Sequence, residues 1–339
     1  MKLLFTLDYE LFMGNQTGTA DHCLINPLDQ YLEATRNYGL RFTLFVDAAY
    51  LFALRSHMAQ HECLRNDFRK ITHHLRTLHD EGHDIQLHIH PQWYYSEFDG
   101  TVWHLDTNHY KLTDMPKAER IELVKESKEL LDSIVGKQTM AFRAGGFSAQ
   151  PSEALTEIFD TCGLTTDSSV CPGERYDSHY QQYDYSHVDR LQAYRFSTDL
   201  CVEDNKGDYT ECPLSMYDVS PLFHWRLLAV RLTTKLTRNT IHNTFGDGHS
   251  VRTTKASILH RLTHTCQTIA TIDGYKISFL KEAIDYYQKH GFDTMCILGH
   301  PKLATPYSVA RLPKICEYAQ SVGHKFITLS ELSYQTCQG

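Results

Sequence analysis

Short apolar runs typical of strands alternate along this chain with longer amphipathic segments typical of helices. The run Met1–Glu10 predicts a first strand that ends in two acids. Asn26-Pro27 predicts the start of a helix that ends at Gly39, because Asn and Pro are favoured where helices begin and Gly where they end. Strands that alternate with helices usually pair in parallel beneath a layer of helices. The sequence therefore predicts an α/β fold, and 339 residues suit a single β/α barrel domain over 1–339.

The same alternation continues to the end of the chain. Further strands are expected at 41–47, 84–89, 139–143, 164–167, 294–298 and 325–329, and further helices at 68–78, 119–134, 151–159, 275–290 and 312–322.

The stretch 171–272 breaks this rhythm and is expected to be a large insertion between strands that covers the active-site mouth. It is rich in Tyr, Asp and Thr up to Tyr209, and a basic helical pattern follows from His224 to Arg238. Such a helix either contacts an anionic lipid carrier or membrane surface, or packs on the fold with a solvated charged face. The residues alone leave both alternatives open.

Composition narrows the classes of function. Hydrophobic residues make up 42% of the chain and charged residues 22%, as in soluble globular enzymes. The net charge of −8 argues against nucleic acid as a main partner. No apolar stretch approaches the roughly 18–20 residues that a membrane span needs.

Cysteine usage and the start of the chain bear on location. The ten cysteines include no C-x-x-C pair, so neither a zinc ribbon nor a disulfide framework is indicated. The apolar stretch after Lys2 meets Asp8 too soon for a secretory signal. We therefore expect a reducing, cytoplasmic location.

Two histidines one residue apart, His88 and His90, come at the end of the expected strand 84–89, just before Pro91. Side chains at i and i+2 of a strand point to the same face, so both imidazoles can hold one metal ion. The alternative is that two of the 21 histidines lie close by chance or line a packed core.

A carboxylate pair at the end of the first strand strengthens the metal interpretation. Asp8 and Glu10 are again i and i+2, although acids in this position are often turn formers or helix caps. In α/β sheets and barrels, chemistry gathers at the carboxyl ends of the strands. One carboxylate and two imidazoles make a divalent-metal site with open positions, and the second carboxylate can act as a base in metal-assisted hydrolysis.

Five segments, in this order, resemble the motifs of the polysaccharide deacetylase family (the NodB-homology domain, carbohydrate esterase family 4). They are Thr6–Glu10, Gly82–His88, Phe142–Gly146, Thr166–Ser169 and Ile297–Pro301. The resemblance implies a distorted seven-stranded β/α barrel and a divalent metal, most often zinc. It also implies removal of an acyl group from a saccharide.

The resemblance carries two departures from the family pattern. Tyr9 stands where the family usually has its metal-binding aspartate, which assigns that role to Glu10. Gln92 stands where the second histidine usually lies, which assigns that role to His90. His83 is a poorer substitute, since five residues from His88 it would face the other side of a strand.

In the resulting hypothesis, Glu10, His88 and His90 hold the metal and Asp8 is the general base. Arg143 pairs with Asp8 and keeps it ionised, unless it forms only a structural ion pair.

The leaving group and the substrate are assigned to a second set of residues. His300 is the candidate general acid, and Asp167 raises its pKa unless Asp167 is simply a cap. Backbone N–H groups around Gly145 and Gly146 help to stabilise the oxyanion, or these glycines serve only the turn. Trp93 forms an aromatic wall for a sugar ring or belongs to the core.

The favoured function is removal of an N-acyl group, in the first place acetyl, from a saccharide or a saccharide intermediate of surface-polysaccharide metabolism. Deformylase or allantoinase-like hydrolysis of another C–N bond is the first alternative. A catalytically decayed carbohydrate-binding protein is another. A non-haem iron oxygenase also uses two histidines and a carboxylate, but the helix-rich pattern disfavours it.

Overall fold

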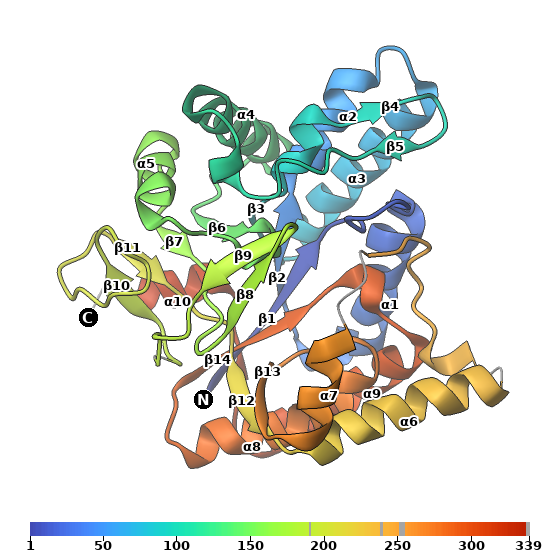
Figure 1. Ribbon diagram of the computed structural model, residues 1–339, viewed down its shortest axis with the longest axis vertical. Helices are drawn as coiled ribbons and strands as arrows, with labels where there is room; N and C mark the ends of the chain where they lie inside the picture. Colours follow the sequence, from blue (N-terminus) through green and yellow to red (C-terminus); the bar gives the residue numbers. More distant parts are fainter. Residues whose placement is uncertain (190, 238–239, 251–254, 337–339) are drawn as a thin grey trace. The chain divides into compact units, whose positions relative to one another are not determined.

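The computed structural model describes residues 1–189, 191–237, 240–250 and 255–336 (Figure 1). The chain divides into two compact units. Unit 1 comprises Met1–Phe5, Leu11–Leu40 and Ser215–Phe326, and unit 2 comprises Thr6–Glu10, Arg41–Leu214 and Ile327–Gly339. The boundary at Leu214 and Ser215 falls inside the stretch 171–272, so the first part of this expected insertion belongs to unit 2 and the rest to unit 1. The single domain over 1–339 stays a prediction.

The sheet of unit 2 begins with the second half of β1 (Lys2–Tyr9). Moving away from β1, the strand order is β2 (Phe42–Asp47), β3 (Asp84–Ile89), β6 (Ala141–Ala144), β7 (Thr166–Asp167), β11 (Tyr209–Glu211) and β10 (Tyr194–Phe196). The pairs from β2 to β11 are parallel, and β10 is antiparallel to β11. Every residue of β2 and β3 is buried. β2 is mostly apolar, as is typical of a strand that is covered on both faces. β3 instead alternates apolar residues with Asp84, Gln86 and His88, whose buried side chains are hydrogen-bonded.

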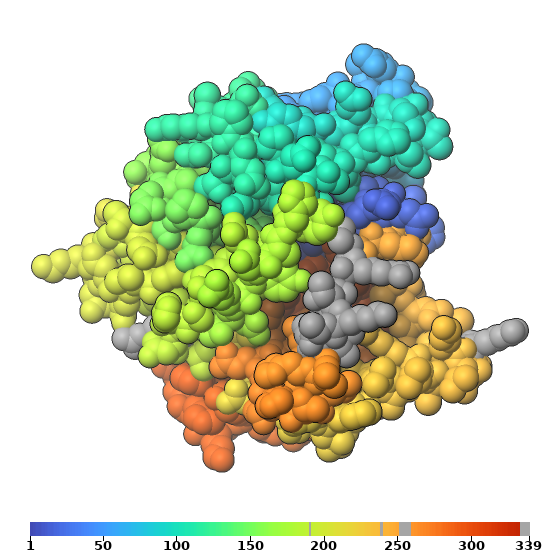
Figure 2. Space-filling view, viewed as in Figure 1, coloured from blue at the N-terminus to red at the C-terminus, as the bar shows by residue number. Residues whose placement is uncertain are grey.

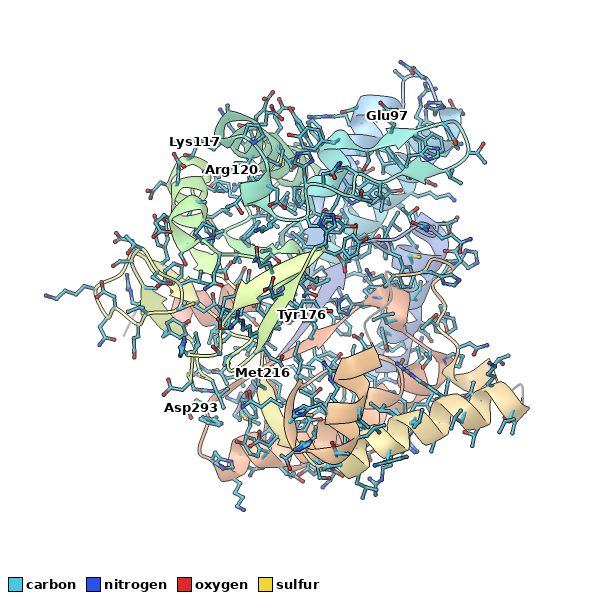
Figure 3. All side chains as sticks on the ribbon, viewed as in Figure 1. Glu97, Lys117, Arg120, Tyr176, Met216 and Asp293 are labelled. Atoms are coloured by element: carbon cyan, nitrogen blue, oxygen red, sulfur yellow. The ribbon has the colours of Figure 1, made fainter. Side chains whose placement is uncertain are left out.

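Helices cover this sheet. They are α2 (Ala48–His57), α3 (Glu62–Asp80), α4 (Lys117–Val135), α5 (Ser152–Cys162) and α10 (Leu329–Thr336). Helices α2, α3 and α4 pack on β3 and on one another, and α4 packs on α5 (Figure 1). Lys117 and Arg120, labelled on α4 in Figure 3, both form ion pairs with Glu157 of α5. Two small hairpins complete unit 2, β4 (Glu97–Phe98) with β5 (Trp103–His104), and β8 (Arg175–Ser178) with β9 (Gln181–Asp184).

Unit 1 contains the start of β1, which pairs in parallel with β15 (Lys325–Phe326), and also β14 (Thr294–Gly299). A separate antiparallel pair joins β12 (Met216–Val219) to β13 (Cys266–Ile269). The helices are α1 (Asn26–Thr35), α6 (Pro221–Thr237), α7 (Lys255–Thr263), α8 (Leu280–Lys289) and α9 (Pro306–Ser321). Among the described residues, no helix combines the length and hydropathy needed to cross a bilayer, and no disulfide joins their cysteines.

The predicted α/β class with a mostly parallel sheet is confirmed. Among the residues that the structure describes, the main sheet has nine strands, where the resemblance implied seven. β10 and β11, which come from the stretch after Cys171, lie at one edge of this sheet.

Several element boundaries differ from prediction. β3 begins and ends as predicted, whereas the helix expected over 275–290 starts as a 3-10 helix over Gly274–Phe279. The strand expected over 325–329 stops at Phe326 and is followed by α10. Arg238, the expected end of the basic helix, lies outside the described residues.

Candidate metal centre

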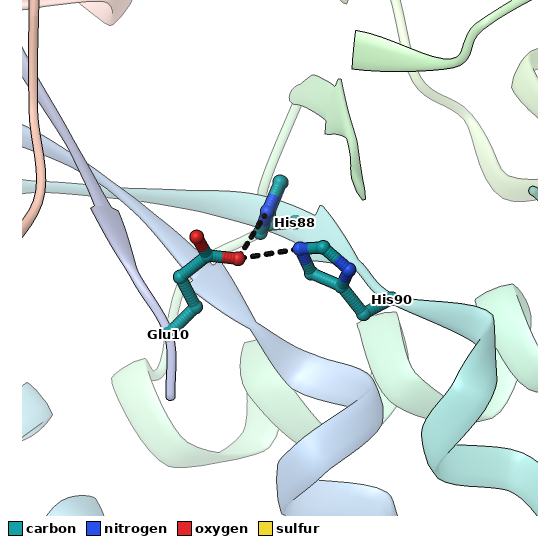
Figure 4. A group of neighbouring side chains, drawn as sticks. All are labelled: Glu10, His88 and His90. Carbon is teal, nitrogen blue, oxygen red and sulfur yellow. Dashed lines mark hydrogen bonds and ion pairs between the residues drawn. The ribbon is translucent and has the colours of Figure 1, made fainter. Parts of the chain in front are cut away.

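Glu10, His88 and His90 converge in unit 2 (Figure 4). Glu10 directly follows β1, His88 lies in β3 and His90 directly follows β3. All three are buried, and one ligand atom from each lies within 4.8 Å of the others. The two imidazoles approach the same carboxylate oxygen, Glu10 Oε2, which lies 3.2 Å from His88 Nε2 and in ion-pair contact with His90 Nε2. The side chains that the sequence named as ligands therefore meet at one point.

The other ring nitrogen of His88 lies 2.7 Å from the backbone carbonyl oxygen of Arg143. A carbonyl oxygen can only accept a hydrogen bond, so Nδ1 carries the proton and donates it. This hydrogen bond orients the imidazole so that Nε2 faces Glu10. Metal-binding histidines usually have such a partner on the second nitrogen. Burial acts to lower the pKa of His88, but the hydrogen bond that the ring donates to Glu10 and the nearby Asp8 and Asp47 carboxylates raise it above its ordinary value. The surroundings of this ring thus favour positive charge.

His90 is held differently. Its backbone N–H donates to Asp47 Oδ1 at 3.2 Å. Within the described residues, neither ring nitrogen forms a hydrogen bond of normal geometry, although Nε2 lies beside Glu10. Buried polar atoms without a hydrogen bond are uncommon in folded proteins. Coordination to an ion at this point would satisfy Nε2.

Gly145 makes room for the His90 ring. A Cβ atom at Gly145 would lie 2.6 Å from the carbonyl oxygen of Ile89 and 2.8 Å from His90 Nδ1. The backbone after β6 can approach His90 this closely only because the residue has no side chain. Gly146 follows with φ of 59°, and its carbonyl accepts from Gln181. Gly145 therefore positions a candidate ligand, a role that the sequence did not suggest.

Asp47 is a site residue that the sequence analysis missed. It ends β2, is buried, and accepts hydrogen bonds from His90 N and from Trp93 Nε1, the latter at 2.8 Å. Burial raises the pKa of Asp47, and the two imidazoles oppose that rise. An acid at the end of an apolar strand is the same sequence pattern that identified Asp8 as a candidate. The same pattern could therefore have identified Asp47 as a candidate site residue.

Trp93 belongs to the core. Its side chain is 1% exposed, donates to Asp47 and packs on Tyr50 and Trp103 with ring centroids 4.7 and 5.3 Å away. Of the two alternatives, this burial favours the core over a sugar-binding wall.

Asp8 lies next to the cluster and is paired with Arg143. Arg143 Nη1 donates to Asp8 Oδ1 at 2.6 Å, and both side chains are buried. An oxygen of Asp8 lies within 4.8 Å of an oxygen of Glu10. The rest of the guanidinium is fixed by Thr6 Oγ1 and by Ser168 Oγ and O, with distances of 2.8–3.1 Å. The pairing expected from the sequence is present, and it fixes one oxygen of Asp8.

His300 lies in unit 1, directly after β14. Its ring Nδ1 is 2.9 Å from Asp273 Oδ2, and its backbone N–H donates to Asp273 Oδ1 at 2.8 Å. Burial acts to raise the pKa of Asp273, but attraction to His300 and these hydrogen bonds hold it below its ordinary value. Asp273 follows no predicted strand end, so no sequence pattern marked it as a site residue.

The expectation that Asp167 is the partner of His300 is corrected by this pairing. Asp167 lies in unit 2, is fully buried, and accepts from Ser169 N and Ser169 Oγ at 2.8 and 2.9 Å. It is in register with Glu211 of β11. Burial raises the pKa of Asp167, opposed by hydrogen bonds with Glu211 and Ser169. Asp167 thus stabilises the loop that contains Ser168. This role is similar to that of a cap, which was the alternative interpretation of Asp167.

His83 and Tyr9 are near the candidate metal ligands in the sequence, but their side chains face away from Glu10, His88 and His90. His83 accepts from Phe42 N at 3.0 Å, and burial lowers its pKa to about 4. The Tyr9 hydroxyl lies 3.0 Å from His74 Nδ1 of α3. Strand alternation explains why Tyr9, between Asp8 and Glu10, is not part of the candidate site.

The donor set fits a divalent cation. One carboxylate and two imidazoles are a common set for zinc and similar ions, and they leave coordination positions for water and substrate. The hydrogen bond from His88 Nδ1 to the Arg143 carbonyl, the His90 ring nitrogens without a normal hydrogen bond and the surrounding carboxylates all agree with a bound cation.

No protein-family model matches the sequence, and a comparison with curated protein sequences gives no match. Solved structures do match. Two proteins named as polysaccharide deacetylases, from Mycobacterium smegmatis and Pseudomonas aeruginosa PAO1, are 14% and 12% identical to this chain, with TM-scores of 0.54 and 0.51. The allantoinase Puue is 11% identical, with a TM-score of 0.52. Each alignment covers 98% of this chain and 89% of the other. The chain therefore has the fold of the polysaccharide deacetylases, which it shares with an allantoinase.

Proposed function

We propose that this protein is a metal-dependent hydrolase that removes an N-acyl group, in the first place acetyl, from a saccharide. The observation that carries the proposal is the convergence of Glu10, His88 and His90 beside the Asp8–Arg143 pair. The deacetylase fold around these residues supports it.

The residues of the candidate metal centre have different proposed roles in catalysis. A divalent ion, most suitably zinc, held by Glu10, His88 and His90 would polarise the acyl carbonyl and lower the pKa of a bound water. Asp8 accepts the proton of the attacking water. Its ion pair with Arg143 favours the ionised carboxylate that this task needs and holds it in one orientation.

Departure of the amine requires a second proton. As the new C–O bond forms and the C–N bond breaks, His300 donates a proton to the leaving nitrogen. Asp273 holds the His300 ring by Nδ1, which assigns the donating role to Nε2. Backbone N–H groups of the turn Gly145–Phe147 are proposed to assist the developing oxyanion. General acid and general base each contribute about 10²–10⁴-fold to such reactions.

The same chemistry opens other C–N bonds. The likeness to an allantoinase favours allantoinase-like hydrolysis as the second candidate, and a deformylase is a close variant of the first. A decayed carbohydrate-binding protein stays the third. The test is incubation of the metal-loaded protein with N-acetylated saccharides, N-formylated saccharides and allantoin. Acetate release supports the proposal, whereas exclusive allantoin turnover, or no turnover with any substrate, contradicts it.

The substrate class and location remain predictions. We propose that the substrate is a cytoplasmic intermediate of surface-polysaccharide metabolism, and that helix α6 makes peripheral contact with a lipid-linked substrate or a membrane surface. Helix α6 lies at the surface on the face seen in Figure 2. It exposes Leu222, Trp225, Leu232 and Leu236, with exposed fractions of 51–81%. Their spacing places them on one side of the helix, with Arg226 and Lys235 at its borders. This pattern suits contact with an anionic lipid surface. Co-sedimentation with vesicles of anionic and of neutral lipid tests it.

A further inference from the structure

Unit 1 contains a cavity of about 830 Å³. Its walls come from α6, from residues 240–244, from the start of the 3-10 helix Gly274–Phe279, and from Leu303 and Thr305. A volume of this size is typical of sites for small molecules and cofactors. All of its lining residues lie in unit 1 and none belongs to the candidate metal centre.

The lining combines positive charge with apolar surface. Arg231, Lys235 and Lys276 contribute cationic side chains, and Asp273 is the one acidic residue among the lining residues that the structure describes. The Asp273 carboxylate already pairs with His300. The charge balance of the lining is therefore positive, which favours an anionic ligand.

The apolar part of the lining comes from Leu227, Val230 and Leu303. Two further lining residues carry buried polar atoms, Thr234 Oγ1 and His242 Nδ1, which have no hydrogen-bond partner within the described part of the chain. Buried polar atoms normally have a hydrogen-bond partner, and a polar group of a bound ligand would supply one for these two atoms. A ligand for this cavity needs an anionic group, hydrogen-bonding oxygens and a hydrocarbon portion.

We propose that this cavity binds a phosphate ester with an apolar portion. Asp273 both lines the cavity and holds the His300 ring at 2.9 Å.

Two sources share this chemistry, a lipid phosphate and a nucleoside diphosphate. Helix α6 favours the lipid. Leu227, Val230 and Thr234 line the cavity from one side of α6, while the helical repeat places the exposed Leu232 and Leu236 on the opposite side. The same helix would then rest on a lipid surface and form a wall of the site behind it.

Binding is measured by calorimetry with four probes: decyl phosphate below its micellar concentration, UDP, inorganic phosphate and decanol. The double variant Arg231→Gln/Lys235→Gln removes two cavity cations. Arg226→Gln is the matched control, since Arg226 lies on the same helix but against Phe279 and outside this cavity. Circular dichroism verifies that each variant is folded.

We expect decyl phosphate to bind more tightly than inorganic phosphate or decanol. Its affinity should fall about tenfold or more in the double variant and stay unchanged in Arg226→Gln. UDP binding with the same dependence would support the phosphate site and assign the nucleotide as its source. The proposal is overturned if neither ester binds more tightly than inorganic phosphate, or if both variants lose affinity equally.

These outcomes separate the cavity from the proposed function. Binding of decyl phosphate by a protein that releases no acyl group would contradict the hydrolase and retain the site. Hydrolysis of N-acyl saccharides by a protein that binds neither ester would contradict the site and retain the hydrolase.

Discussion

His88 and Arg143 are joined across strands β3 and β6 by a 2.7 Å hydrogen bond from the imidazole Nδ1 to the backbone carbonyl. The two residues are also register partners in the parallel pair. The guanidinium of the same Arg143 binds Asp8 at 2.6 Å. One residue thus orients a proposed metal ligand through its backbone and the proposed base through its side chain, so the β3–β6 register couples the two.

Asp8→Asn should separate catalysis from metal binding. The amide keeps the shape of Asp8 but cannot accept the proton of the attacking water. We expect a loss of acyl release on the order of 10²–10⁴-fold with an unchanged metal content. Hydrolysis rates and elemental analysis of the same preparation check this. Full activity in the variant would exclude Asp8 as the base.

Gly145→Ala should weaken metal binding through His90. The added Cβ would meet Ile89 O at 2.6 Å and His90 Nδ1 at 2.8 Å, so the ring must move. We expect metal affinity to fall about 10–100-fold, as for other residues that support a ligand. Gly136→Ala is the control: its φ is 70° and its Cβ would contact nothing within 4 Å, so it should reduce stability alone. Equal metal affinity in the two variants would refute a positioning role for Gly145.

Asp273→Asn should change the pH dependence of catalysis. Loss of the carboxylate disfavours the imidazolium form of His300, the form that donates a proton. We expect kcat to fall about tenfold or more, up to the roughly 10²–10⁴-fold that a general acid supplies, and the alkaline limb of the kcat profile to move to lower pH. The metal content should not change. A uniform loss of activity at every pH would indicate a structural role instead.

His83 should make the fold sensitive to acid. Its pKa is about 4 in the folded chain because burial, together with the charge of Arg41, disfavours the protonated ring, whereas an unfolded histidine has a pKa of about 6.5. Between these values the unfolded chain binds a proton that the folded chain does not. Stability is therefore lost as pH falls through this window, by about 1.4 kcal/mol per pH unit at most.

The variant His83→Asn measures this contribution. Its side-chain oxygen can still accept from Phe42 N, as His83 Nδ1 does at 3.0 Å, but it does not titrate. Urea unfolding between pH 7 and pH 4.5 should give a shallower fall in the free energy of unfolding for the variant than for the natural protein. Parallel curves would contradict the assignment.

Local sequence patterns predicted the parts of the site that depend on a single strand. His88 and His90 share a face because of strand alternation, and Asp8 and Glu10 flank a tyrosine that turns towards α3 for the same reason. β2 was predictable because a strand buried on both faces is mostly apolar, and β3 because apolar and polar residues alternate along it.

The missed features depend on contacts between distant segments. Asp273 partners His300 from 27 residues away, and nothing in its neighbours marks it as a partner. The role of Gly145 depends on how closely the turn after β6 approaches His90, which only the strand register determines. The misassignment of Asp167 followed from motif order, whereas burial between Ser169 and Glu211 decides its contacts.

Elemental analysis of the purified protein and of His88→Ala and His90→Ala tests the metal centre most directly. The account predicts a stoichiometric divalent ion, zinc in the first place, in the natural protein after equilibration with divalent metals. It predicts that each alanine variant loses that ion while remaining folded. A natural protein that retains no divalent ion, or variants that retain it fully, would contradict the account.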